Sequence, residues 1–222
     1  MKKIDTLVED IYSLFDLSAI DMSEEDVDKY VEEFGEMVKL HTKKFLYAEE
    51  SIDKKLRLSQ IGKPDRQLWF DINSNKERAS LTSSTRIKFL YGYILEEFLL
   101  MCASIAGHDV KDQQKEVSVG GVVGHQDCII DGVLVDVKSA STSSFKKFKN
   151  NTLLEDDPFG YIAQISAYAQ ANGLKDAAFL AIDKSTGEVV LTPVHSMEFI
   201  NAEERIKHLK GCLLYTSPSP RD

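Results

Sequence analysis

Residues 122–138 read VVGHQDCIIDGVLVDVK, and two runs of β-branched and apolar residues flank Asp131-Gly132 within this stretch. An Asp-Gly pair between such runs is typical of a tight turn joining two antiparallel strands. Gly120-Gly121 gives a similar turn signal just upstream. The pattern therefore predicts an antiparallel meander with strands over residues 115–119, 122–130 and 133–138.

The segments around this meander alternate between helix and strand patterns. Apolar residues recur every three to four positions in segments that we predict to be helices, namely 5–17, 24–46, 84–106 and 157–171. Two later apolar runs predict strands over 177–183 and 189–194, whereas 59–80 and 139–151 carry turn or polar signals and are expected to be irregular. This order predicts the α/β fold class, with a central mixed β-sheet flanked by helices and an N-terminal helical extension.

The composition is that of a globular protein with an uneven charge distribution. The chain has 222 residues, is 43 % hydrophobic and carries a net charge of −9. Residues 1–37 hold twelve acidic and three basic side chains, so the remainder is neutral overall. A basic surface is therefore compatible with the acidic total. Since no apolar run reaches the roughly 18 residues of a membrane span, we expect no membrane association and a cytoplasmic location.

The last eleven residues, CLLYTSPSPRD, match the translation of a DNA adapter used to prepare sequencing libraries. We predict that these residues are not native. Cys212 then drops from the count of natural cysteines, which leaves Cys102 and Cys128 as expected buried apolar residues. The predicted organisation is an acidic helical extension over 1–54, a main domain over 55–211 and the adapter segment over 212–222.

Two acidic residues and a lysine are expected to meet on the predicted hairpin. Counted from the turn, Asp127 pairs near Asp136, and in Asp136-Val137-Lys138 the acid and the lysine share one face because strand side chains alternate. Carboxylate oxygens suit Mg²⁺, and a lysine beside the ion can orient a water molecule. The alternative is an ordinary cross-strand ion pair on a solvent face. The apolar residues that surround Asp136 in its strand favour a functional site.

The segment 84–106 adds two further acids. Its apolar residues occur on nearly every side of the predicted helix, yet Glu96 and Glu97 lie in the middle of it. Burying a carboxylate costs several kcal/mol unless it finds a cation or a hydrogen-bond donor. At least one of these glutamates is therefore expected to face a partner group.

Taken together, these motifs resemble the PD-(D/E)XK nuclease superfamily, in its RecB-like and phage exonuclease branch. The resemblance rests on Asp127 with Asp136-x-Lys138, Gly92-x-x-x-Glu96, Tyr161-x-x-Gln164-x-x-x-Tyr168 and the segment Pro64-Asp65-Arg66-Gln67-Leu68-Trp69, in this order. It covers roughly residues 55–194 and implies a restriction-endonuclease-like core, so that 55–211 is expected to be a nuclease domain. Asp65 stands where iron–sulfur relatives carry a cysteine, and their C-terminal cysteine cluster is absent, so no iron–sulfur cluster is expected. Gln126 replaces the family proline before Asp127, which is a common variation.

The resemblance implies a role for each matching residue. Asp127 and Asp136 are expected to bind Mg²⁺ or Mn²⁺ together with the backbone carbonyl of Val137. Glu96 is expected to support the metal, with Glu97 as the alternative ligand. Lys138 is expected to position the attacking water, and Gln164 to hold either the substrate or Lys138.

The expected DNA contacts do not read sequence, because basic side chains reach the phosphate backbone. The candidates are Arg66, Lys146, Lys147, Lys149 and Tyr168. For Arg66 the alternative is a salt bridge to the acidic N-terminal helices, for the three lysines an exposed loop, and for Tyr168 core packing. A recombination or single-strand annealing protein is a candidate partner.

The resemblance implies a metal-dependent deoxyribonuclease, an exonuclease on linear DNA, acting in phage-type recombination or DNA processing. A phage protein of this kind would work in the cytoplasm of its host. Two alternatives remain open at this point, a structure-specific endonuclease and a non-catalytic DNA-binding protein with a nuclease-like fold. The presence of Glu96, Asp127, Asp136 and Lys138 favours an enzyme. The acidic helices of 1–54 are expected to cover a DNA channel, to dock a partner or to complete the core.

Overall fold

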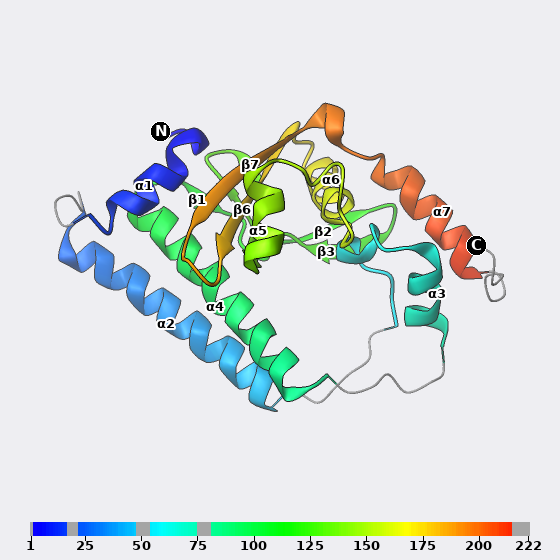
Figure 1. Ribbon diagram of the computed structural model, residues 1–222, viewed down its shortest axis with the longest axis horizontal. Helices are drawn as coiled ribbons and strands as arrows, with labels where there is room; N and C mark the ends of the chain where they lie inside the picture. Colours follow the sequence, from blue (N-terminus) through cyan, green and yellow to red (C-terminus); the bar gives the residue numbers. More distant parts are fainter. Residues whose placement is uncertain (1, 17–21, 48–53, 75–80, 215–222) are drawn as a thin grey trace.

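The computed structural model describes residues 2–16, 22–47, 54–74 and 81–214. A central sheet lies between two layers of helices (Figure 1). It has five strands in the order β1-β4-β5-β6-β7. Only β5 and β6 run parallel among these neighbours. The strands are β1 (Val110–Lys111), β4 (Cys128–Ile130), β5 (Val133–Ala140), β6 (Asp176–Asp183) and β7 (Val189–His195). The predicted α/β fold with a central mixed sheet and an N-terminal helical part is confirmed.

The predicted strand over 122–130 is wrong in one respect, because the chain leaves one sheet and enters another within it. Its first half, β3 (Val122–His125), pairs with β2 (Glu116–Val119) in a separate two-stranded sheet, and its second half is β4. Gln126 marks the break. Its side chain is fully buried, and its Oε1 accepts a hydrogen bond of 2.6 Å from Nδ2 of Asn172. Asp127 therefore lies in a short link rather than inside a strand.

One face of the sheet is covered by α1 (Leu7–Ser13) and α4 (Ser83–Ile105), and α2 (Glu24–Tyr47) lies alongside α4 (Figure 1). Leu7 and Ile11 of α1 are buried in the same apolar cluster as Leu99 of α4 and Val135 of β5. Of the roles left open for residues 1–54, α1 therefore serves to complete the core. The buried state expected for both Cys102 and Cys128 is confirmed.

The opposite face is covered by α5 (Thr142–Lys149) and α6 (Tyr161–Ala171), while α3 (Asp65–Asn73) packs against α7 (Ala202–Leu214) beside them (Figure 1). The irregular structure expected over 139–151 and 59–80 is thus wrong where α5 and α3 form. Ser141 caps α5, and Phe145 and Phe148, three positions apart, are both buried. Short 3-10 helices complete the fold at Ile4–Thr6, Leu58–Gln60 and Ser196–Glu198.

A close approach of α4 to the sheet occurs at Gly92. A Cβ atom built on Gly92 would lie 3.3 Å from the hydroxyl oxygen of Ser139 in β5. Glycine therefore lets the helix pass close to the end of this strand, one turn before Glu96.

No helix within the described ranges is long and apolar enough to cross a membrane. The adapter assignment of 212–222 stays a prediction, since 212–214 extend α7 and 215–222 lie outside the described residues.

The Leu99→Ala substitution is expected to destabilise the protein by about 2–5 kcal/mol, because it leaves a cavity in a fully buried position of α4. Ile87→Ala, in the same helix at a side chain that is 67 % exposed, is the matched control and should cost less than about 1 kcal/mol. Urea denaturation of both variants measures the difference. Equal losses of stability would contradict the packing described for α4.

Candidate active site

The site is built where β5 loses its neighbour. Cys128, the first residue of β4, pairs with Val135, so β5 has no strand partner on this side from Asp136 onward. Asp127 covers the opening: its Oδ2 accepts a hydrogen bond of 2.7 Å from the backbone N–H of Val137. Since the N–H and C=O of a strand residue point to the same side, the carbonyl of Val137 faces the same open edge. Side chains from both helical layers can meet at this edge.

Asp136 lies at the centre of the site and is almost fully buried, with 1 % of its surface exposed. Its Oδ1 accepts a hydrogen bond of 3.0 Å from Nε2 of Gln164 in α6. Its Oδ2 forms an ion pair with the ammonium group of Lys138. Gln164 therefore holds Asp136, whereas the sequence-based expectation named the substrate or Lys138.

Lys138 is enclosed by opposite charge and by an aromatic ring. Its Nζ lies 5.1 Å from the ring centroid of Tyr161, a favourable position for a cation over an aromatic face. Burial alone would lower the pKa of Lys138, but the carboxylates of Asp136 and Asp127 outweigh burial and raise this pKa above its ordinary value. Lys138 is therefore an ammonium ion at neutral pH, suited to orient a water molecule and stabilise negative charge rather than to accept a proton.

The two neighbouring glutamates of α4 face different partners. Burial and the nearby carboxylate of Asp127 raise the pKa of Glu96 to about 9, and its Oε1 accepts a hydrogen bond of 2.8 Å from Nε2 of Gln114. Glu97 is buried and lies 3.4 Å from Nε2 of His41 in α2. Glu96 thus lies beside Asp127, whereas Glu97 contacts His41 of α2 and is still near enough to raise the pKa of Asp127.

The donor atoms of this cluster fit a hard divalent cation. Burial and the carboxylate of Asp136 raise the pKa of Asp127 to about 7, while Lys138 and the N–H of Val137 act in the opposite direction. A carboxylate whose pKa is raised by a neighbouring carboxylate is stabilised in its charged form by a bound cation. The carboxylate oxygens of Asp127 and of Asp136, whose Oδ2 contacts the ammonium group of Lys138, are the ligand type that Mg²⁺ or Mn²⁺ prefers.

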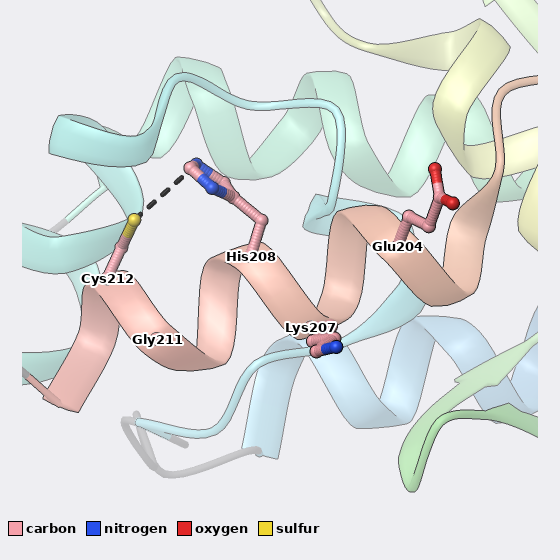
Figure 2. A pocket seen from close by; sticks show the side chains of 5 residues that line it. All are labelled: Glu204, Lys207, His208, Gly211 and Cys212. Carbon is pink, nitrogen blue, oxygen red and sulfur yellow. Dashed lines mark hydrogen bonds between the residues drawn. The ribbon is translucent and has the colours of Figure 1, made fainter.

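A tighter group of potential ligands lies on α3 and α7. Oxygen, nitrogen and sulfur atoms of Asp65, His208 and Cys212 all lie within 4.8 Å of one another, whereas the carboxylates of Glu96, Asp127 and Asp136 are not such a group. A dashed line joins His208 and Cys212 in Figure 2. Nε2 of His208 lies 3.4 Å from Sγ of Cys212. Because Cys212 belongs to the predicted adapter segment, we assign this group no role. At the candidate site, two carboxylates suffice for Mg²⁺, which keeps several water ligands.

Three of the five residues expected to contact DNA are either buried or held in ion pairs. Tyr168 is 2 % exposed, which makes it a core residue and excludes direct contact with DNA in this structure. Lys147 and Lys149 lie on α5 rather than in a loop, in ion pairs with Asp156 at 2.6 Å and Glu188 at 2.5 Å. The ammonium group of Lys147 also donates a hydrogen bond to the backbone oxygen of Asp156, so it stabilises the segment that follows α5.

The remaining two cations are exposed. Lys146 lies on α5, and the described part of the chain offers it no ion pair; Arg66 lies on α3 with its guanidinium 5.9 Å from the ring of Phe70. No salt bridge from Arg66 to the acidic N-terminal helices occurs among the described residues. Both side chains remain candidates for phosphate contact.

Sequence reasoning missed two residues that shape the site. Tyr161 appeared in a motif but received no role, although its ring covers Lys138. His41 lay unremarked in an amphipathic helix, yet it fixes Glu97 and stacks on Tyr93 with ring centroids 4.7 Å apart. The position of Tyr161 one turn before Gln164 was a usable signal, whereas nothing in the pattern around His41 pointed to α4.

Comparison with known proteins gives structural likeness only. No family model and no curated protein matches the chain. An alkaline exonuclease (LHK-Exo) from Laribacter hongkongensis is 14 % identical with a TM-score of 0.49, and the alignment covers 72 % of this chain and 87 % of that one. A phage-related exonuclease from Haemophilus somnus 129PT is 14 % identical with a TM-score of 0.46, covering 72 % and 90 %. At these scores the likenesses carry no argument, and the function is inferred from the residues.

The raised pKa values predict how pH and metal act on stability. Asp127 (pKa about 7) and Glu96 (pKa about 9) stay protonated in the folded protein at pH values where the unfolded chain has already released these protons, near pH 4. The free energy of unfolding therefore falls as the pH rises from about 4 toward those pKa values. Mg²⁺ binds the deprotonated groups. The increase in Tm on adding Mg²⁺ should therefore be larger at about pH 8 than at about pH 5.5. An equal increase at both pH values, measured by calorimetry, would contradict this coupling.

Proposed function

We propose that this protein is a metal-dependent deoxyribonuclease of the PD-(D/E)XK type that hydrolyses phosphodiester bonds at the ends of linear DNA. The observation that carries the proposal is the meeting of Asp127, Asp136 and Lys138 at the unpaired edge of β5. Acids and a lysine placed in this way can hold a metal ion, a water molecule and a phosphate side by side.

In this proposal Asp127, Asp136 and the carbonyl of Val137 hold Mg²⁺ or Mn²⁺, with Glu96 beside them. A divalent ion held there would provide Lewis-acid stabilisation of the phosphate and lower the pKa of a bound water molecule. Lys138, as an ammonium ion, orients the attacking water and stabilises the negative charge that develops on the phosphate. Gln164 acts on Asp136, whose carboxylate it fixes through the hydrogen bond of 3.0 Å.

The DNA-binding part of the proposal rests on cations outside the acidic cluster. Lys146 and Arg66 are exposed and would contact phosphates, which gives binding without sequence preference. Lys149 is half-exposed in a surface ion pair, and such a pair is weak enough to be exchanged for a phosphate. The affinity of the protein for DNA should accordingly fall steeply as the salt concentration rises.

The experiment that tests the proposal compares linear and circular duplex DNA with Mg²⁺ or EDTA. The linear duplex is labelled at the 5′ end in one reaction and at the 3′ end in another. Mg²⁺-dependent loss of linear DNA alone is expected, and the order of label release gives the polarity. Cutting of circles would instead indicate a structure-specific endonuclease, and binding of DNA with no cleavage would indicate a non-catalytic protein.

A further inference from the structure

An exposed aromatic ring lies close to the lysine of the candidate active site. Phe159, just before α6, is 58 % exposed. Its ring stacks on that of Tyr161, with centroids 5.3 Å apart and an interplanar angle of 26°. Tyr161 in turn lies beneath the ammonium group of Lys138. The exposed ring of Phe159 is thus separated from Lys138 by one aromatic side chain.

The backbone around Phe159 is held firmly. Both carboxylate oxygens of Asp157 accept hydrogen bonds from the first turn of α6, at 2.9 Å from the N–H of Tyr161 and at 2.8 Å from that of Ile162. Gly160 has a φ of +74° and lies against the backbone of Gly62 so closely that a Cβ on either glycine would overlap the other. The segment is therefore pre-organised, and the outward position of Phe159 is fixed by its neighbours.

Tyr161 is equally fixed from the inside. Its ring lies 6.1 Å from that of Phe148 and 6.2 Å from that of Phe179, two buried residues on α5 and β6. A column of aromatic rings thus runs from the core to the surface and ends at Phe159. A ring held rigidly in water offers a flat apolar face at low entropic cost to a ligand that has a flat face of its own.

We propose that Phe159 is a stacking platform for the base of the nucleotide at the end of the DNA strand being degraded. The inference rests on the proposed function, which places the phosphate beside Lys138. Bases within a duplex are covered by their neighbours, so the free face required here belongs to a terminal or unpaired nucleotide. Because every base has such a face, stacking accepts any sequence, in keeping with binding through phosphates.

A binding assay that needs neither metal nor cleavage tests the platform. The probe is a fluorescein-labelled single-stranded oligonucleotide in EDTA, together with a series in which one nucleotide at a time is abasic. Wild-type protein should bind the intact oligonucleotide about tenfold more tightly than the form in which the nucleotide at one end is abasic, and an effect confined to internal positions would contradict the platform. The Phe159→Ala variant should bind the intact oligonucleotide about tenfold more weakly than wild type does. Its affinity for the oligonucleotide that is abasic at that position should be no lower than its affinity for the intact one. Phe159→Trp should restore the wild-type pattern, and Phe159→Leu should not.

The matched control is Leu154→Ala, which removes a side chain that is 50 % exposed in the same connection between α5 and α6. It should bind like wild type. The platform is overturned if the abasic nucleotide lowers the affinity of the Phe159→Ala variant as much as it lowers that of wild type. If wild type cleaves linear DNA and Phe159→Ala binds as wild type does, the platform is wrong and the proposed function stands. If wild type shows no cleavage but the coupling between Phe159 and the abasic position is found, the platform is right and the hydrolytic function is wrong.

Discussion

The Asp136→Asn substitution is expected to lower kcat for DNA cleavage by about 10³-fold or more while the protein stays folded. Asparagine has the same shape, and its Oδ1 can still accept the hydrogen bond from Gln164. It removes, however, the negative charge that a divalent cation requires and that Lys138 contacts. Losing a metal ligand removes several kcal/mol of transition-state stabilisation, and each 1.4 kcal/mol corresponds to a factor of ten in rate.

The matched control for this variant is Asp183→Asn. Asp183 is also 1 % exposed and ends the neighbouring strand β6, where its carboxylate accepts hydrogen bonds from Ser185 and Thr142. The same change of charge at Asp183 should leave the rate within a few-fold of wild type. Single-turnover cleavage of a labelled linear duplex, with circular dichroism to verify folding, measures both variants. A well-folded Asp136→Asn variant with undiminished activity would remove the carboxylate from the mechanism.

The Lys138→Met substitution is expected to reduce kcat by about 10²–10³-fold and to leave the affinity for Mg²⁺ unchanged or higher. Methionine retains the apolar length of the side chain and its packing against Tyr161, but it carries no charge. Removing a cation from beside the two carboxylates favours the binding of another cation. The effect should therefore appear in the chemical step rather than in metal binding.

Lys111→Met is the matched control for the loss of charge. Lys111 also has a pKa raised by a hydrogen bond to a carboxylate, that of Asp109, but it lies on the edge strand β1. This variant should cleave DNA within about twofold of wild type. Calorimetric titration with Mg²⁺ distinguishes the two roles of Lys138, because a Lys138→Met variant that has lost metal affinity would make this lysine a structural residue.

The local part of the candidate site could be predicted from the sequence. Asp131-Gly132 sets the turn, and the alternation of the strands then places Asp127 beside Asp136, as the pairing of Cys128 with Val135 in the structure requires. Turn chemistry and the two-residue period of a strand act over short distances. The bounds of three further elements also follow from local patterns. The predicted bounds agree within one or two residues with the structure for the helix over 84–106 and for the strands over 177–183 and 189–194.

The features that were missed depend on contacts between distant segments. The change of sheet at Gln126 is fixed by Asn172, which lies 46 residues away in sequence. The direction in which Glu96 and Glu97 point is settled by His41 on α2, and the pattern of α4 alone leaves both glutamates plausible. The helix α5 reads as a polar loop because its apolar face consists of Phe145 and Phe148 alone.

The most direct test is a titration of the metal-free protein with Mn²⁺, followed by electron paramagnetic resonance, in which bound and free Mn²⁺ are distinguished. A Cys212→Ser background removes the cysteine of the group on α3 and α7, so that its contribution is separated. We predict Mn²⁺ binding that is retained in this background and in Asp183→Asn and is lost in both Asp127→Asn and Asp136→Asn. Binding that persists unchanged when Asp127 and Asp136 are both neutralised would contradict a metal centre at the edge of β5.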